Sequence, residues 1–233
     1  MPRRSYDHYC PLSRALDVIG ERWTLLIVRE LLAGPRRYTD LHADLPGVST
    51  DVLAARLKEL ERDGLLARRR LPPPASASVY ELTRRGESLL PALTALADWG
   101  AAELTPEPGP TDALRPHWFA LPLIRAIGEL APGLAGPADP GGPGPSHKTA
   151  ANAQANPGAV NVRVSEGIFH ILLGGTGPRY GHGPAGHPLA QLTLSPAAVL
   201  ALVQNTATLP ELIATGQAQA DGDGPLAAAL RGP

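Results

Sequence analysis

Three consecutive arginines, Arg68, Arg69 and Arg70, follow the apolar stretch Leu65-Leu66-Ala67. A guanidinium is a planar and permanently charged donor that suits phosphate oxygens, so this run has the chemistry to neutralise a nucleic-acid backbone. Runs of like charge also occur on solvated surfaces that bind nothing. The arginines therefore indicate phosphate contact only if the surrounding elements can hold them against a duplex.

Cys10 is the single cysteine of the chain, which excludes an internal disulfide and a CxxC metal site. Arg3, Arg4, His8 and the N-terminus of a following helix would all favour its thiolate, which makes Cys10 a candidate redox sensor. The alternative is a small residue packed ahead of that helix, and the sequence leaves both open.

Three histidines, His170, His182 and His187, suggest a metal site, but no carboxylate or thiol lies close enough in sequence to complete it. Loop histidines are usually solvated, so we expect no metal and no cofactor. The sequence also lacks a nucleophile motif, a glycine loop that cradles phosphate and a paired-carboxylate signature. We therefore expect a protein that is not an enzyme.

Composition limits the class of protein. The chain has 233 residues, 43% hydrophobic and 18% charged, with a net charge of −1, so any nucleic-acid contact must come from local clustering of basic residues. No apolar run approaches the roughly 20 residues that span a bilayer. No apolar stretch follows Arg3 and Arg4, so we expect no secretory segment and a soluble, cytoplasmic protein without membrane contact.

Pro and Gly divide the chain. We expect a charge-dense domain over residues 1–104, and a helix at 111–130, interrupted by Pro116 and Pro122, within a connecting region at 105–158. Residues 132–158 are so rich in Gly and Pro that we expect a mobile linker there. The remaining residues, 159–233, form the second domain together with the helix at 111–130.

Helical patterns fill much of the first domain. Trp23, Leu26, Ile27 and Leu31 form an apolar stripe that ends at Gly34-Pro35. A short helix over 38–45 can be capped by Thr39, and Ser49 can cap the next helix. In that helix Leu53, Leu57 and Leu60 face the core, and Asp63-Gly64 ends it.

Two strands, around 65–71 and 78–83, follow this helix pair and are joined by a proline-rich tip. A helix–turn–helix followed by such a hairpin is a winged helix, in which the second helix enters the major groove and the hairpin meets phosphates. Alternation places Arg68 and Arg70 on one face of the hairpin and Arg69 on the other. A long helix over 84–104 follows, with an apolar stripe of Leu89, Leu93, Leu96 and Trp99 that exceeds what one small domain needs.

The segments "CPLSRALDVIGERWTLLIVRELLAGPRRYTDLHADLPGVSTDVLAARLKELERDGLLARR" and "YELTRRGESLLPALTALADWG" resemble the HxlR family of bacterial winged-helix regulators over residues 10–104. The resemblance implies a homodimer formed through the terminal helices of the domain. It also implies binding to an inverted-repeat operator with half-sites about one helical turn apart. The residues expected to contact DNA are Arg36, Arg37, Thr39, Ser49, Thr50, Asp51, Ala55, Lys58, Arg68, Arg69 and Arg70. A cysteine in the place of Cys10 senses oxidants or electrophiles in some members.

The second domain reads as strands and helices around one sheet, with a turn at 165–167 and a helix that Ser195 caps and Pro196 starts. The run "LTLSPAAVLALV…TLPELIATGQAQADGDGPLAAAL" resembles the sterol carrier protein-like fold, over roughly 115–231. That resemblance implies a pocket for a hydrophobic ligand, lined by Trp118, Phe119, Leu123, Phe169, Ile171, Leu192, Leu194 and Leu200. The departures are the 132–158 stretch, which displaces the first strand region, and an aromatic content of 4%. They leave a packing or dimerisation module as the alternative.

The whole sequence thus predicts an α+β protein with an N-terminal winged helix-turn-helix domain and a C-terminal single-sheet α/β domain of sterol carrier protein-like type. We interpret it as a DNA-binding repressor that acts as a homodimer, controlled by a hydrophobic effector or by Cys10 oxidation. A lipid or hydrophobic small-molecule binding protein, whose winged domain mainly dimerises, is the competing interpretation. A redox switch driven by Cys10 alone is the third.

Overall fold

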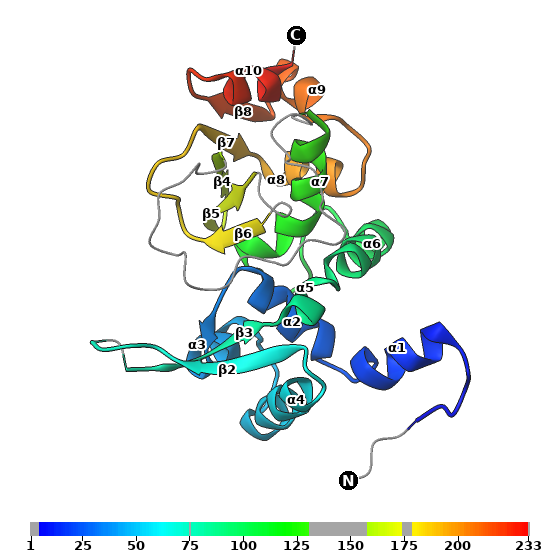
Figure 1. Cartoon of the computed structure of the whole chain (residues 1–233). Helices are drawn as coiled ribbons and strands as arrows, with labels where there is room; N and C mark the ends of the chain where they lie inside the picture. The colour runs from blue at the N-terminus through cyan, green and yellow to red at the C-terminus, as the bar shows by residue number, and fades with distance from the viewer. Residues whose placement is uncertain (1–4, 75, 131–157, 174–178, 233) are drawn as a thin grey trace. The chain divides into compact units, whose positions relative to one another are not determined.

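The computed structural model describes residues 5–74, 76–130, 158–173 and 179–232 (Figure 1). The chain forms two compact units, residues 1–93 and 94–233. Most of the linker predicted at 132–158 lies outside the described residues. Within the described parts of the chain, no helix combines the length and apolarity needed to cross a membrane.

The first unit is a winged helix-turn-helix. Its three-stranded antiparallel sheet has the order β1-β3-β2, and β2 and β3 form the wing. Helices α2, α3 and α4 precede the hairpin in the order that the sequence predicts. The elements are α1 (Pro11–Ile19), α2 (Thr24–Leu32), β1 (Arg36–Arg37), α3 (Tyr38–Asp44), α4 (Thr50–Arg62), β2 (Leu66–Arg70), β3 (Ser78–Leu82) and α5 (Arg84–Glu87).

The ends of α4 form as predicted. The Ser49 hydroxyl accepts a hydrogen bond from the Val52 amide at 3.3 Å, which satisfies one of the free N–H groups of the first turn. Gly64 adopts a φ of 70° just beyond the last turn, a conformation that glycine adopts without steric cost. Between these ends Leu53, Leu57 and Leu60 are buried, so the predicted inward stripe is confirmed.

Two helix predictions in this part of the chain are wrong. Helix α3 begins at Tyr38 with Arg37 as its N-cap, so Thr39 lies inside the first turn and does not cap it. The single helix expected over 84–104 is divided into α5 and α6 (Leu90–Gly100). Pro91 explains the division, because it has no N–H to donate to a preceding turn and is tolerated only at the start of a new helix.

The second unit is built on a five-stranded sheet of order β6-β5-β4-β7-β8, in which β4 and β7 are parallel and the other neighbours are antiparallel. Figure 1 shows α7 lying along one face of this sheet. The elements are η1 (Ala101–Glu103), η2 (Pro116–Phe119), α7 (Ala120–Leu130), β4 (Ala159–Val164), β5 (Gly167–Leu172), β6 (Arg179–His182), β7 (Ala190–Leu194), α8 (Pro196–Val203), α9 (Leu209–Ala214), β8 (Ala218–Asp221) and α10 (Pro225–Arg231).

The predicted turn between β4 and β5 and the Ser195 cap are confirmed; the Ser195 hydroxyl accepts from the Ala198 amide at 3.1 Å. The interruption expected at Pro116 and Pro122 is wrong. Pro116 begins the 3₁₀ turn η2, and Pro122 falls in the first turn of α7, where a missing N–H costs nothing. Strand β6 was not predicted, since its four residues, Arg-Tyr-Gly-His, are too few to show an alternation of apolar and polar side chains.

Candidate functional site

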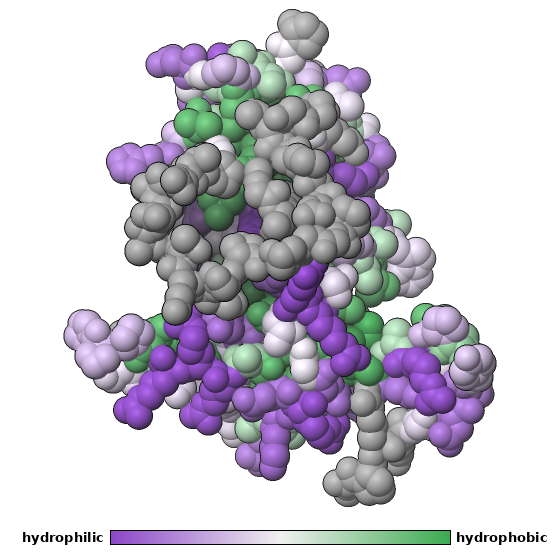
Figure 2. Space-filling model, viewed as in Figure 1, coloured by the Kyte–Doolittle hydropathy of each residue, from purple (hydrophilic) through white to green (hydrophobic). Residues whose placement is uncertain are grey.

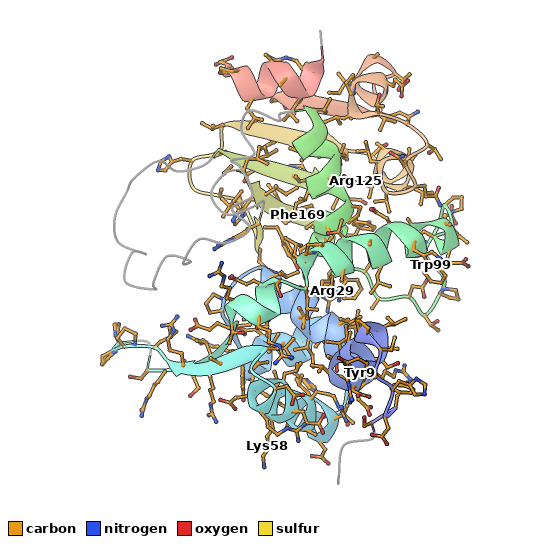
Figure 3. The ribbon with its side chains drawn as sticks, turned by 45° about the vertical axis from the view of Figure 1, so that its right-hand side comes forward. Tyr9, Arg29, Lys58, Trp99, Arg125 and Phe169 are labelled. Carbon is orange, nitrogen blue, oxygen red and sulfur yellow. The ribbon has the colours of Figure 1, made fainter. Side chains whose placement is uncertain are left out.

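Helix α4 presents a polar face to solvent, opposite its buried leucines. Thr50, Asp51, Ala55 and Lys58 are all exposed on it, and so is Ser49 at its start. Figure 3 shows Lys58 pointing away from the body of the first unit. Because this face carries short side chains and one long cation, it can approach the floor of a major groove closely.

Tyr38 fixes the start of α4 from the preceding helix. Its hydroxyl donates a hydrogen bond to the Thr50 carbonyl at 2.9 Å, and its ring stacks with that of His42 at a centroid distance of 6.3 Å. Sequence reasoning missed Tyr38, because nothing in its local pattern shows that α3 and α4 will bring it to that carbonyl.

The three arginines of the wing differ in their partners. The Arg69 Nε lies 3.1 Å from both carboxylate oxygens of Glu81 on the neighbouring strand. On the other face, Arg68 lies over the Tyr80 ring, 5.9 Å from its centroid, and donates to the Ser78 hydroxyl at 3.4 Å. The Arg70 side chain is exposed and makes no hydrogen bond or ion pair with another residue that the structure describes. The predicted alternation is confirmed, and Arg68 and Arg70 share the face that carries unneutralised charge.

The residues of β1 and α3 that were predicted to contact DNA differ in their exposure and in their ion pairing. Arg36 forms an ion pair with Asp44 and is only partly exposed, so its charge is already compensated within the unit. Arg37 and Thr39 are exposed. Figure 2 shows hydrophilic side chains gathered over the wing and α4 in the first unit.

Cys10 is the N-cap of α1 and is exposed. Hydrogen bonding from the Ser13 backbone amide, then from the Leu12 amide and the Ser13 hydroxyl, lowers the pKa of the Cys10 thiol below its usual value. The helix N-terminus thus favours the thiolate, as the sequence predicts. The Nδ1 of His8 lies 3.3 Å from the Ser13 hydroxyl, while Arg3 and Arg4 lie outside the described residues.

Helix α1 has apolar side chains that are exposed to solvent in the single chain. None of its residues is buried, and Leu12 and Leu16, one turn apart, are 67% and 39% exposed. Tyr9, just ahead of the helix, is fully exposed (Figure 3). Apolar side chains at this spacing on an otherwise solvated helix favour burial against another surface.

The second unit contains a pocket of about 530 Å³, a volume typical of small-molecule sites. Of the residues predicted to line such a pocket, Trp118, Phe119 and Leu200 do so. The other five are a correction: Leu123, Phe169, Ile171, Leu192 and Leu194 do not line the pocket and are buried in the core. Figure 3 shows Phe169 on the sheet beside α7. Side chains alternate between the two faces of a strand, and that of Phe169 lies on the face toward this helix.

The structure separates the three histidines that could have been metal ligands. His170 and His182 project from opposite faces of the sheet, since His182 pairs with Phe169 and His170 pairs with Gly181. The Nδ1 of His170 lies 2.9 Å from the Gly183 carbonyl, and His187 is exposed. His182 instead lies against His117, with ring centroids 4.0 Å apart.

Comparison with known proteins gives matches to the first part of the chain. Residues 18–108 match the model of the HxlR-like helix-turn-helix family. The HTH-type transcriptional regulator YvaP of Bacillus subtilis is 38% identical over 98 residues, which are 42% of this chain and 91% of YvaP. YodB, an HTH-type transcriptional regulator of the same organism, is 35% identical over 103 residues, 44% of this chain and 90% of YodB.

The solved structure of the reduced form of YodB from B. subtilis matches with a TM-score of 0.38 and 31% identity, over 43% of this chain and 100% of that chain. The family model and both sequence relatives cover the winged helix-turn-helix with its capped α4 and basic hairpin. Because nearly the whole length of YvaP aligns at this identity, the protein belongs to the HxlR-like helix-turn-helix family.

Proposed function

We propose that this protein is a transcriptional regulator that binds an inverted-repeat operator as a homodimer and represses the genes beside it. The observation that carries this proposal is the joint placement of the exposed polar face of α4 and the Arg68–Arg70 face of the wing. A helix presented in this way reads base edges, and a basic hairpin beside it contacts phosphates. The protein acts by binding, with no catalytic step.

The residues proposed to contact DNA follow from their exposure. Thr50, Asp51, Ala55 and Lys58 face the bases, and Ser49 and Thr39 lie near the adjoining backbone. Asp51 repels phosphate, so its carboxylate accepts from a cytosine amino group or turns away. Arg37, Arg68 and Arg70 contact phosphates. Arg69 and Arg36 act indirectly, because each is paired with a carboxylate of its own unit.

The homodimer is supported by the uncovered apolar face of α1. Leu12 and Leu16 are not buried within the first unit. Trp99 of α6 is a further exposed apolar side chain, with 79% of its surface accessible. A dimer built through terminal helices would bury such side chains and set the half-site spacing.

Fluorescence anisotropy tests the proposal. The full-length protein is titrated against DNA from upstream of its own gene across a salt series, with scrambled DNA as the control. We expect a dissociation constant on the order of 10⁻⁸ M or tighter at physiological salt, and much weaker binding to the scrambled sequence. Weak binding without preference, to this region and to neighbouring promoters, would contradict a role as a regulator.

A second function is supported by the 530 Å³ pocket. We propose that the second unit is of sterol carrier protein-like type and binds a hydrophobic effector, which changes operator affinity by binding one dimer geometry better than another. The order of β7, capped α8, α9, β8 and α10 supports the fold assignment. Ligand uptake by a chain without DNA affinity would favour the competing proposal of a small-molecule binding protein.

Cys10 carries the third proposal, control of operator affinity by oxidants or electrophiles. Its exposure and its place at a helix N-terminus support this role. The test is titration with diamide or a quinone while operator affinity is followed by anisotropy. Unchanged affinity of a chain that is fully modified at Cys10 would refute the sensor role.

A further inference from the structure

The charged residues among the described lining of the pocket in the second unit are all acidic. Among the described residues that line it, Glu103, Asp112 and Glu166 are acidic and none is Lys, Arg or His. Most of the remaining wall is apolar and includes Leu104, Trp118, Phe119, Val199, Leu200 and Val203. These three carboxylates repel an anion that enters the pocket and attract a cation.

The three carboxylates come from separate parts of the chain. Glu103 lies in η1, Asp112 in the loop before η2, and Glu166 at the turn between β4 and β5. Only the fold brings them to one cavity, so they are not a local run of acidic residues on a solvated segment. Each is exposed, which leaves its charge open to a ligand that enters from solvent.

Contacts within the second unit hold the walls of the pocket. The Gln204 side chain, just after α8, donates hydrogen bonds to the carbonyls of Ala101, at 3.2 Å, and Leu104, at 2.9 Å, which flank Glu103. The Gly109 amide donates to an Asp112 carboxylate oxygen at 2.8 Å and closes the loop between them. A cavity that is already formed spares a ligand part of the entropic cost of ordering its site.

An ion pair joins the two helices on either side of this region. Arg125 of α7 lies 3.5 Å from Asp98 of α6, and both are outside the pocket lining. Trp99 lies on the outer side of α6 in Figure 3 and does not line the cavity. Trp118 does line it, and an indole ring is the aromatic side chain that attracts a cation most strongly.

We propose that this cavity binds a hydrophobic organic cation, such as a quaternary ammonium or phosphonium that bears aromatic groups. Its role as the effector of a regulator rests on the proposed function, but the binding itself does not. The cavity volume suits a compact molecule of this class, the apolar wall takes its substituents and the carboxylates take its charge.

Isothermal titration calorimetry of the full-length protein with two probes tests this ligand class without DNA. Tetraphenylphosphonium and tetraphenylborate have nearly the same size and shape but opposite charge. We expect binding of the phosphonium, with the borate at least about tenfold weaker, a difference of about 1.4 kcal/mol. No phosphonium binding, equal affinities or a preference for the borate would overturn the proposal.

Variants locate the site and its charge. The double variant Glu103→Gln/Glu166→Gln should weaken phosphonium binding about fivefold, as two partly solvated charges allow, while Asp223→Asn, an exposed acid outside the lining, should leave it unchanged. Ala113→Trp should abolish binding by filling the pocket. Glu103→Lys/Glu166→Lys should reverse the preference toward the borate, a gain that misfolding cannot produce. Phosphonium affinity that survives Ala113→Trp would place the binding elsewhere and refute the proposal.

If the phosphonium binds as expected but leaves operator affinity unchanged, the ligand class stands and its regulatory role fails. If operator DNA is not bound at all, the regulator proposal fails independently of the calorimetry.

Discussion

Arg69 and Glu81 face each other across the hairpin of the wing, with the arginine Nε 3.1 Å from both carboxylate oxygens. This pair neutralises one of three consecutive arginines within the protein itself. The two others, Arg68 and Arg70, lie on the opposite face of the hairpin. The charge that the wing can offer to a duplex is therefore concentrated on a single face.

The first prediction concerns this asymmetry. In Arg68→Ala/Arg70→Ala, binding to all DNA sequences should weaken, and the slope of log K against log salt should flatten by about 0.9 for each phosphate that the variant no longer neutralises. Anisotropy titrations across a salt series measure the slope. The matched control is Arg69→Gln/Glu81→Gln, which removes an internal ion pair without changing net charge and should keep the wild-type slope. An unchanged slope in the first variant would mean that this face does not touch phosphate.

Capping provides a second prediction, on stability. Ser49→Ala removes the acceptor for the Val52 amide and should lower the free energy of unfolding by about 1 kcal/mol. Thr39→Ala should change it little, because Thr39 does not cap α3. Urea unfolding followed by circular dichroism compares the two. A larger loss in Thr39→Ala than in Ser49→Ala would contradict the assignment of the caps.

The uncovered face of α1 leads to a third prediction. Leu12→Arg/Leu16→Arg should convert the proposed dimer to a monomer, since two charges cannot be buried in an apolar interface without partners. Light scattering after size exclusion gives the mass. Val52→Arg, at an exposed apolar position on α4, serves as the control and should remain dimeric. A double variant that keeps the dimer mass would move the interface away from α1.

The fourth prediction follows from the lowered pKa of Cys10. A lowered pKa leaves more thiolate at neutral pH, so alkylation by iodoacetamide should be faster there than for an ordinary thiol and should slow as the pH falls through that pKa. Mass spectrometry measures the alkylation rate of Cys10 at a series of pH values. Ser13→Ala should move the profile slightly toward the ordinary thiol, because the hydroxyl contributes less than the backbone amides. A wild-type profile equal to that of a free cysteine would contradict this environment.

Local signals predicted much of the first unit correctly. The Ser49 cap, the stop at Gly64 and the stripe of Leu53, Leu57 and Leu60 depend on residues a few positions apart, so the chain carries them wherever it folds. Predictions failed where one residue fits two roles. Thr39 is a capping residue by type but lies inside the helix, and Pro91 divides a pattern that is otherwise continuous from 84 to 104.

Sequence by itself determined the helix pair, the hairpin and the opposite faces of the arginines, because periodicity and capping act over one or two turns of chain. Tertiary structure alone decided which arginines remain available, through the pairing of Arg36 with Asp44 and of Arg69 with Glu81. It also decided that five predicted pocket residues became core and that Glu103, Asp112 and Glu166 meet in one cavity. Ion pairs and cavities join residues distant in sequence, and their partners are chosen only when the elements pack.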